Sequence, residues 1–272
     1  MKFALKSIVA AASFVAVSAA SAATGYAWDV GSGTGSLTFS ADALSAISAS
    51  SSNLVTPALL PNIAGFNVTP GATNNAKIAS GVVTLTFDNA TVNGDTLTSL
   101  QSSNSFVNIK RTTIDENDVQ QSNSIFMANF DVNLAESTIY ADLYTRNNTA
   151  GTIQSFGKQA IFTATEPGGV TGGTGGVIVV DGITGNTVNG HADGALNGPL
   201  RMTASTANTV LSGLGLSTSA TDPVAVLVRT ANWGNTAASG NFTAPVPEPT
   251  TYAMIIAGLA CVGAMSRRRK AA

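Results

Sequence analysis

Apolar and polar side chains alternate with a period of two along most of the chain after residue 27. The longest run is 124–134, where we expect one face to carry Phe126, Ala128, Phe130, Val132 and Leu134 and the other to carry Met127, Asn129, Asp131 and Asn133. Further strands are predicted at 35–40, 81–87, 137–145, 158–165, 177–180 and 224–229. Strands with one polar face favour antiparallel pairing. The expected fold class is therefore all-β, with an antiparallel β-sandwich or jelly-roll-like body.

Two short segments have a helical pattern instead. Residues 41–48 place Leu44 and Ile47 on one side, and Asp42 lies near the positive end of the helix dipole. Residues 206–216 have a similar pattern, although two glycines disfavour a helix there. The sequence therefore predicts one or two short helices beside the sheets.

The first 23 residues have the pattern of a secretory signal peptide. Lys2 and Lys6 precede an apolar run at 8–17, which is too short to span a bilayer. Small residues follow, and they predict cleavage after Ala22 or Ala23. The expected partners of this segment are the Sec translocon and signal peptidase, and the rest of the chain is expected to be exported.

The region between the two ends of the chain is sparsely charged and acidic. Residues 24–246 contain 7 Lys and Arg against 14 Asp and Glu, which gives a net charge of −7. Such a surface does not attract phosphate backbones, so we expect no nucleic-acid partner. The only cysteine is Cys261, so this region can form no internal disulfide. The glycine-rich stretch 168–176 is either a linker between two units or a loop within one domain, and we favour one continuous domain.

The residues needed for familiar catalytic chemistry are scarce. His191 is the only histidine, and no Gly-x-Ser-x-Gly motif accompanies it. A zinc site needs three or four Cys, His or carboxylate ligands. The body has one histidine and no cysteine, so we expect no zinc site. We therefore expect no catalytic residues, no metal-binding residues and no cofactor, and we expect that the protein is not an enzyme.

Three features leave alternatives open. The cluster Asp115-Glu116-Asn117-Asp118 is either a polar loop or a calcium site, although its spacing does not match an EF-hand loop. Trp28 and Trp233 are either core residues or rings on which sugars stack. Two acids about 5–10 Å apart in a cleft would indicate a glycosidase-like hydrolase. A carbohydrate-binding β-sandwich, with or without calcium, and an exported carboxylate-dependent hydrolase thus remain alternatives to a structural role.

The C-terminal segment 244–272 differs from the body. It contains, in order, Pro247, Glu248 and Pro249, an uncharged run at 252–265, and the bases Arg267, Arg268, Arg269 and Lys270. With its uncharged neighbours the run makes a helix of about 25 Å, which spans a bilayer core of about 30 Å marginally. Lys and Arg residues stay on the cytoplasmic side and stop transfer. The sequence therefore predicts a single transmembrane helix with the body outside.

This order of a Pro-Glu-Pro triplet, an apolar span and a basic cluster resembles the PEP-CTERM sorting signal of exported proteins in Gram-negative bacteria. The resemblance implies processing near Pro247-Glu248-Pro249 by an exosortase, which is an integral-membrane protease-transpeptidase. It also implies transient anchoring in the inner membrane and delivery to the cell surface or the extracellular polysaccharide matrix. It implies nothing about the activity of the body, because unrelated bodies share the signal.

Together these observations predict three parts: a signal peptide at 1–23, a β-rich extracellular body at 24–243 and a sorting signal at 244–272. The functional hypothesis is an exported structural protein of the cell surface or extracellular matrix, associated with biofilm or exopolysaccharide.

Overall fold

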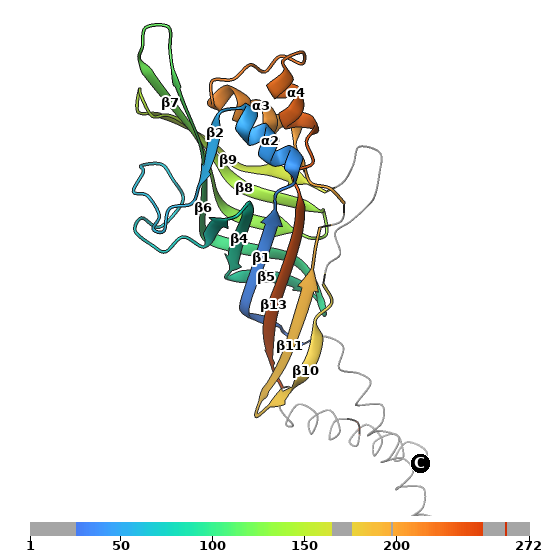
Figure 1. The fold of residues 1–272 in the computed structure, drawn as a ribbon. Helices are drawn as coiled ribbons and strands as arrows, with labels where there is room; N and C mark the ends of the chain where they lie inside the picture. Colours follow the sequence, from blue (N-terminus) through green and yellow to red (C-terminus); the bar gives the residue numbers. More distant parts are fainter. Residues whose placement is uncertain (1–25, 165–175, 197, 247–258, 260–272) are drawn as a thin grey trace, which may run out of the picture.

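A computed structural model describes residues 26–164, 176–196, 198–246 and 259 of the chain (Figure 1). The chain forms two antiparallel sheets and three short helices, which agrees with the predicted all-β, sandwich-like fold. The strands are β1 (Asp29–Thr38), β2 (Ser52–Val55), β3 (Ala76–Ala79), β4 (Val82–Phe87), β5 (Asn89–Asn93), β6 (Thr96–Ile114), β7 (Gln120–Asn133), β8 (Thr138–Asn147), β9 (Thr152–Thr163), β10 (Val179–Thr184), β11 (Thr187–Gly194), β12 (Arg201–Met202) and β13 (Asn235–Pro245). The helices are α2 (Ala41–Ala49), α3 (Ala204–Gly213) and α4 (Pro223–Thr230).

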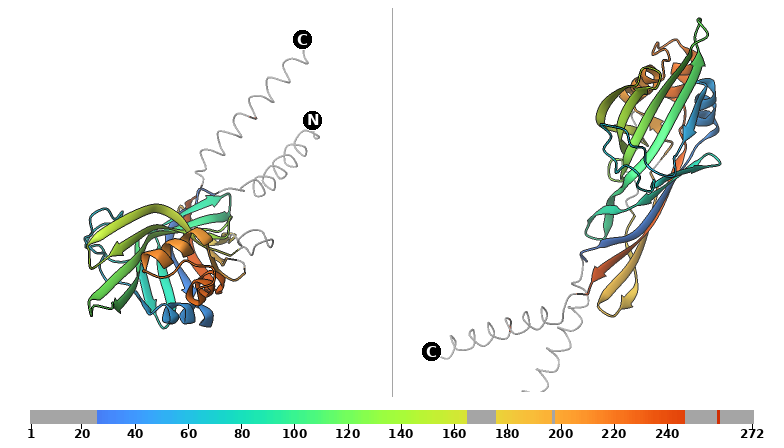
Figure 2. Two further views of the ribbon diagram at one scale, coloured as in Figure 1. Left: turned by 90° about the horizontal axis from the view of Figure 1, so that it is seen from above. Right: turned by 90° about the vertical axis from the view of Figure 1, so that its left-hand side faces the viewer.

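The first sheet joins the two ends of the body. Its six strands have the order β10-β11-β13-β1-β4-β3, so the last strand, β13, pairs with the first strand, β1. The strands β10, β11 and β13, which follow the glycine-rich stretch 168–176, therefore belong to the same sheet as β1, whereas the two-residue strand β12 pairs with β9 of the other sheet. The second sheet has the order β12-β9-β8-β7-β6-β2, and β5 also pairs with β6. Figure 2 shows the two sheets from above and from the side.

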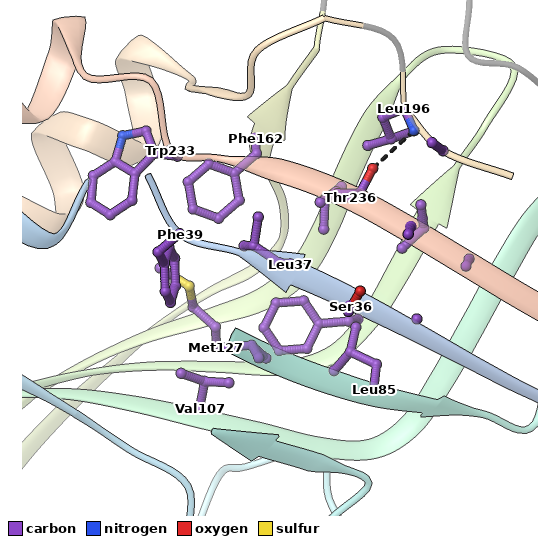
Figure 3. Close-up of a pocket in the computed structure, with 18 of the residues that line it drawn as sticks. Ser36, Leu37, Phe39, Leu85, Val107, Met127, Phe162, Leu196, Trp233 and Thr236 are labelled. Atoms are coloured by element: carbon purple, nitrogen blue, oxygen red, sulfur yellow. Dashed lines mark hydrogen bonds between the residues drawn. The ribbon is translucent and has the colours of Figure 1, made fainter. Parts of the chain in front are cut away.

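The main hydrophobic core lies between the sheets. Among its fully buried side chains are Phe242 of β13, Ile125 of β7 and Leu143 of β8. The core leaves a cavity of about 70 Å³, which is lined almost entirely by apolar atoms (Figure 3). Since even a dry cavity of about 150 Å³ holds only a ligand of benzene size, we interpret this space as a packing void rather than a binding site.

The two predicted helices are confirmed as α2 and α3, and each begins at a hydroxyl N-cap. The side chain of Ser40 accepts a hydrogen bond from Ala43 N at 3.2 Å, and that of Thr203 accepts one from Thr206 N at 3.4 Å. Such caps satisfy amide groups that the first helical turn leaves without partners. The helix α3 begins two residues before the start of the predicted range 206–216 and ends three residues before the end of that range.

The predicted strand at 224–229 is wrong, because these residues form the third helix, α4. Asp222 caps the helix by accepting a hydrogen bond from Ala225 N at 3.0 Å, and Pro223 occupies the first turn, where its missing N–H costs nothing. The helix buries Ala225 and Val228, three positions apart on one face. The cap and this spacing outweigh the strand preference of the valines, which the sequence prediction followed.

The predicted alternation through 124–134 is wrong at its centre. Phe126 and Ala128 lie in a second apolar cluster, whereas Phe130 and Val132 point into the main core between the sheets. The face changes at Asn129, where β7 has one more residue than β8 between their paired positions. Asn129 has a φ of 52°, in the left-handed region, as an extra residue in a β-bulge can require. The bulge shifts the side-chain period by one residue and so exchanges the two faces.

Two predicted segments lie outside the described residues. These are the signal peptide at 1–23 and, except for Leu259, the predicted transmembrane helix with its basic tail. Within the part of the chain that the structure describes, no helix is long and apolar enough to cross a membrane.

Gly35 of β1 provides a stability test of the packing between the sheets. An added Cβ would lie 2.6 Å from Cε2 of Phe87, so we expect Gly35→Ala to destabilise the body by about 1–3 kcal/mol. Urea denaturation measures this loss. The matched control is Gly182→Ala, where the added Cβ meets no atom within 4 Å. Equal unfolding midpoints for Gly35→Ala and the control would contradict the packing.

Candidate functional site

A loop at residues 56–75 covers part of the outer face of the seven-stranded sheet, the face turned away from the main core. Phe66 of this loop packs against Tyr144, with ring centroids 4.4 Å apart, and against Phe126 at 5.0 Å. These residues belong to a second apolar cluster formed by Leu60, Phe106, Phe126, Ala128 and Tyr144, with Ile63, Phe66, Val68 and Ala72 packed on it. The cluster fixes the loop on the sheet and forms the floor of the candidate site.

Beside this cluster, β6 also departs from regular pairing. It has three residues between Ser102 and Phe106 where β7 has one between their partners, so the intervening backbone bulges. The hydroxyl of Ser105 donates to Ser102 O at 2.6 Å and accepts from Phe130 N at 3.0 Å. Asn104, within the bulge, has a φ of 54°. Hydrogen bonds therefore hold an irregular backbone at the edge of the outer face.

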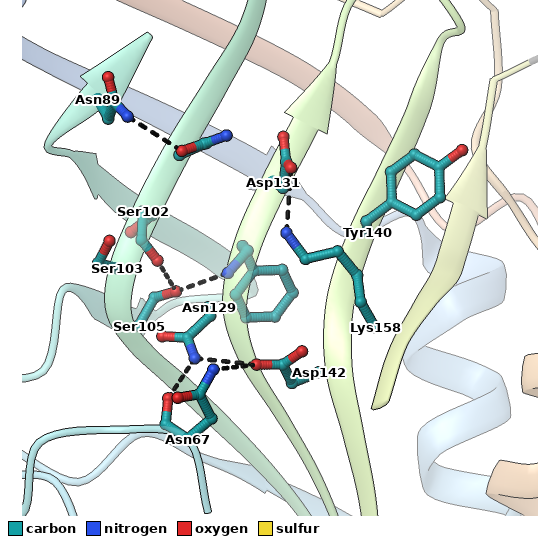
Figure 4. A network of polar contacts seen from close by, with 12 residues as sticks. Asn67, Asn89, Ser102, Ser103, Ser105, Asn129, Asp131, Tyr140, Asp142 and Lys158 are labelled. Atoms are coloured by element: carbon teal, nitrogen blue, oxygen red, sulfur yellow. Dashed lines mark hydrogen bonds and ion pairs between the residues drawn. The ribbon is translucent and has the colours of Figure 1, made fainter. Parts of the chain in front are cut away.

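An amide and carboxylate network links the two bulges to the loop (Figure 4). The Nδ2 of Asn129 donates to Oδ2 of Asp142 at 3.0 Å and also to the carbonyl oxygen of Asn67. The Oδ1 of Asn129 accepts from Asn104 N at 3.0 Å. Asn67 donates a second amide hydrogen to Oδ2 of Asp142 at 3.4 Å, and Asn104 Oδ1 accepts from Thr69 N at 2.9 Å. Side chains from β6, β7, β8 and the loop thus meet at one point.

These residues line a polar cleft of about 490 Å³. Its lining comprises Phe66, Asn67, Val68, Thr69, Ser103, Asn104, Asn129, Asp142 and Lys158. Asp142 is the only acid in this lining, so the cleft does not contain the pair of acids that a glycosidase-like hydrolase would need. Asp142 is only 8% exposed, and both of its amide donors bond to the same oxygen.

Lys158 lies at the rim of the cleft. It is the β9 residue directly paired with Asp142 of β8, but its ammonium group forms an ion pair with Asp131 at 3.1 Å. The cleft therefore combines a buried carboxylate acceptor with amide, hydroxyl and ammonium donors. Side-chain groups of this kind are suited to a ligand that carries many hydroxyl groups.

Two tyrosines near the cleft have raised pKa values. Burial raises the pKa of Tyr144, and the negative charge of Asp142 adds to the effect, although the hydrogen bond from Asn67 N opposes it. The pKa of Tyr140 is raised first by its 2.8 Å hydrogen bond to Glu136 and then by burial and by nearby negative charge. Both phenols therefore stay protonated at neutral pH and can act as hydrogen-bond donors.

The acidic cluster at 115–118 forms the turn between β6 and β7. The carboxylate of Asp115 accepts from Gln121 Nε2 at 3.0 Å and from the backbone N of Asn117 and of Val119. These hydrogen bonds lower the pKa of Asp115, and the bond from Gln121 has the largest effect. The arrangement favours the polar-loop interpretation. Within the described residues, no group of three or more His, Cys, Asp and Glu side chains could hold a metal ion.

The two tryptophans are core residues rather than exposed rings. Trp28 is 7% exposed and donates from Nε1 to Asp95 at 2.9 Å, whereas Trp233 is 4% exposed and donates to Val228 O at 3.2 Å. His191 lies on β11, and its Nδ1 is 2.6 Å from Oδ1 of Asp181 on β10. It pairs across a hairpin and not with Asp193. Neither tryptophan nor the histidine contributes to the cleft.

The residues of the cleft were not predicted as a site. The sequence does contain two signals. Asn129 interrupts an apolar run, and Asp142 stands between Tyr140 and Tyr144 on one face of a strand. Neither signal shows that the two residues meet, because that depends on the register of β7 with β8. Pro247, Glu248, Pro249 and the four terminal bases lie outside the described residues.

Comparison with known proteins identifies a family motif in the C-terminal segment. Fold and composition define a β-sandwich protein with a distinct, basic C-terminal segment. Residues 245–270 match the family described as the PEP-CTERM protein-sorting motif. The chain thus carries a PEP-CTERM motif, as the sequence predicted, and is an exported protein sorted through a membrane-associated pathway with an exosortase as its processing partner. No curated protein and no solved structure matches the chain.

Proposed function

We propose that the sorted protein is a non-catalytic component of the cell surface or extracellular matrix, and that its polar cleft binds exopolysaccharide. The observation that carries the proposal is the buried carboxylate of Asp142, held by the amides of Asn67 and Asn129 in an open cleft on a sheet face. A sugar hydroxyl donates to a carboxylate and accepts from amide or ammonium groups, so one ligand satisfies both. Sorting through the motif supports an exterior location where such a ligand is found.

Hydrogen bonds rather than ring stacking would dominate this contact. Trp28 and Trp233 are buried, so neither offers a face to a sugar. Phe66 is the only aromatic residue in the cleft lining, and its ring already packs against Tyr144. Affinity for a single sugar unit is therefore expected to be weak, and a polymer that offers many units would strengthen retention through repeated contacts.

Removal of the Asp142 charge tests the proposal. We expect Asp142→Asn to weaken binding of the mature protein to isolated exopolysaccharide by about tenfold or more, because a hydrogen bond to a charged acceptor contributes about 1.5–3 kcal/mol. Glycan arrays and cosedimentation measure the binding. The matched control is Asp193→Asn, an exposed acid on the other sheet. Absence of glycan binding by the unaltered protein, with and without calcium, would contradict the proposal.

A further inference from the structure

The sorting motif begins where the folded sheet ends. Strand β13 lies between β11 and β1 and ends at Pro245, which is also the first residue of the matched motif. The next residue, Val246, donates its backbone N–H to the carbonyl oxygen of Asn186 at 2.9 Å, in the turn between β10 and β11. Pro247 of the triplet follows directly. No spacer separates the motif from the β10–β11 hairpin.

This hairpin exposes a group of large apolar side chains. Val179 is 53% exposed, Val180 46% and Ile183 61%, and all three belong to β10, the edge strand of the six-stranded sheet. Val180 and Ile183 pair with Gly190 and Val188 of β11, so they lie on the side of the hairpin where Trp28 packs at Gly190, whereas Val179 pairs with His191 and lies on the other side. All three side chains are exposed because β10 is the edge strand of the sheet. About half or more of each of these three side chains is therefore not covered by the described part of the chain. Clustered apolar side chains of this kind mark interaction surfaces.

The hairpin also lies within reach of the membrane. Five residues lie between Val246 and Tyr252, where the uncharged run begins, and the six extended Cα–Cα steps from one to the other cover at most about 20 Å. Figure 1 shows β13 beside the β10–β11 hairpin. An enzyme that holds the Pro-Glu-Pro triplet, which begins one residue after Val246, would therefore contact or closely approach the turn to which Val246 is bonded.

The charge of the hairpin favours a protein partner over lipid. Residues 176–194 contain Asp181 and Asp193 but no Lys or Arg. Anionic headgroups attract basic segments and would repel this one. We propose that the exposed apolar edge of the β10–β11 hairpin, formed by Val179, Val180 and Ile183 of β10, is a docking surface for the exosortase that processes the motif. The proposal depends on sorting through the motif and is independent of the polysaccharide cleft.

The first test measures processing of the full chain in a host that has the sorting pathway. We expect the triple variant Val179→Ser, Val180→Ser and Ile183→Ser to lower the rate of C-terminal processing about tenfold in a pulse-chase experiment. The matched control replaces an isoleucine and two valines of similar exposure in and beside the distant β6–β7 hairpin: Ile114→Ser at 72%, Val119→Ser at 47% and Val55→Ser at 45%. It should be processed at the original rate. Equal rates for the two triple variants would overturn the proposal.

A second measurement does not require the triple variant to fold. A photo-crosslinking residue at Val180 of the otherwise unaltered chain should give an adduct with the exosortase, whereas one at Ile114 should not. No adduct at Val180 would overturn the proposal. Two further results would reassign the surface. Loss of binding to phosphatidylethanolamine–phosphatidylglycerol vesicles by the hairpin variant would indicate lipid, and loss of a dimer at unchanged processing would indicate a second copy of the chain.

Discussion

Replacing Pro247, Glu248 and Pro249 with alanine is expected to abolish C-terminal processing and to leave the chain in the inner membrane. The triplet lies within the matched motif at 245–270, and its two prolines disfavour helix in the residues before them, so the sequence favours an extended conformation for binding by the enzyme. The alanine variant would remove this restriction on the backbone and the carboxylate of Glu248. Cell fractionation with an antibody to the body, followed by mass spectrometry of the C-terminus, measures the result.

The control for this experiment is Glu116→Ala, which removes an exposed acid from the turn between β6 and β7. It should be exported and processed like the unaltered chain. If the triplet variant were processed at the same position and reached the same fraction as this control, the motif would not be the sorting signal. The body lies before the triplet, so the variant should keep the unfolding midpoint of the unaltered body.

The largest expected effect on stability is that of Phe106→Ala, in the cluster below the cleft. Phe106 is 1% exposed, and its ring centroid lies 5.3 Å from that of Phe126 and 6.0 Å from that of Phe66. Truncating such a ring costs about 3–5 kcal/mol, since the lost contacts add to the cost of the cavity. Urea denaturation should show a clear decrease in midpoint, and loss of glycan binding should follow because Phe66 supports the loop at 66–69.

A conservative change and an exposed change serve as controls for Phe106→Ala. Phe106→Leu retains most of the apolar volume and should cost much less than the alanine variant. Leu59→Ala, in the same loop region but 59% exposed, should have little effect. If Phe106→Ala and Leu59→Ala had the same midpoint, the second cluster would not stabilise the body.

Local patterns in the sequence were sufficient for β1, β4, β7, β8, β9 and β10 and for the helices α2 and α3, but they did not indicate β2, β3, β5, β11, β12, β13 or the long strand β6. The alternation of Val83, Leu85 and Phe87 is visible without a partner strand and corresponds to β4. The helix α4 was missed because three valines within 224–228 have strand preference, while its start depends on Asp222 and Pro223 just before them. A cap is a local signal, and in this case it was present and overlooked.

The cleft could not be predicted because its parts are distant in sequence. Asn67 and Asp142 are 75 residues apart, and Asn129 reaches them only through a bulge in β7. Whether a strand bulges depends on pairing with its neighbours, and an alternating pattern continues unchanged through the position. The sorting motif was predictable for the opposite reason, since all of its parts are contiguous.

Intact mass spectrometry of the protein recovered outside the cells tests the central claim most directly. The account predicts a single species that begins after Ala22 or Ala23, retains β13 through Pro245, ends near the Pro247-Glu248-Pro249 triplet and lacks the run at 252–265 and the four terminal bases. Recovery of a chain that still contains Arg267, Arg268, Arg269 and Lys270 would contradict the conclusion that the C-terminal segment is a sorting signal removed from the folded body.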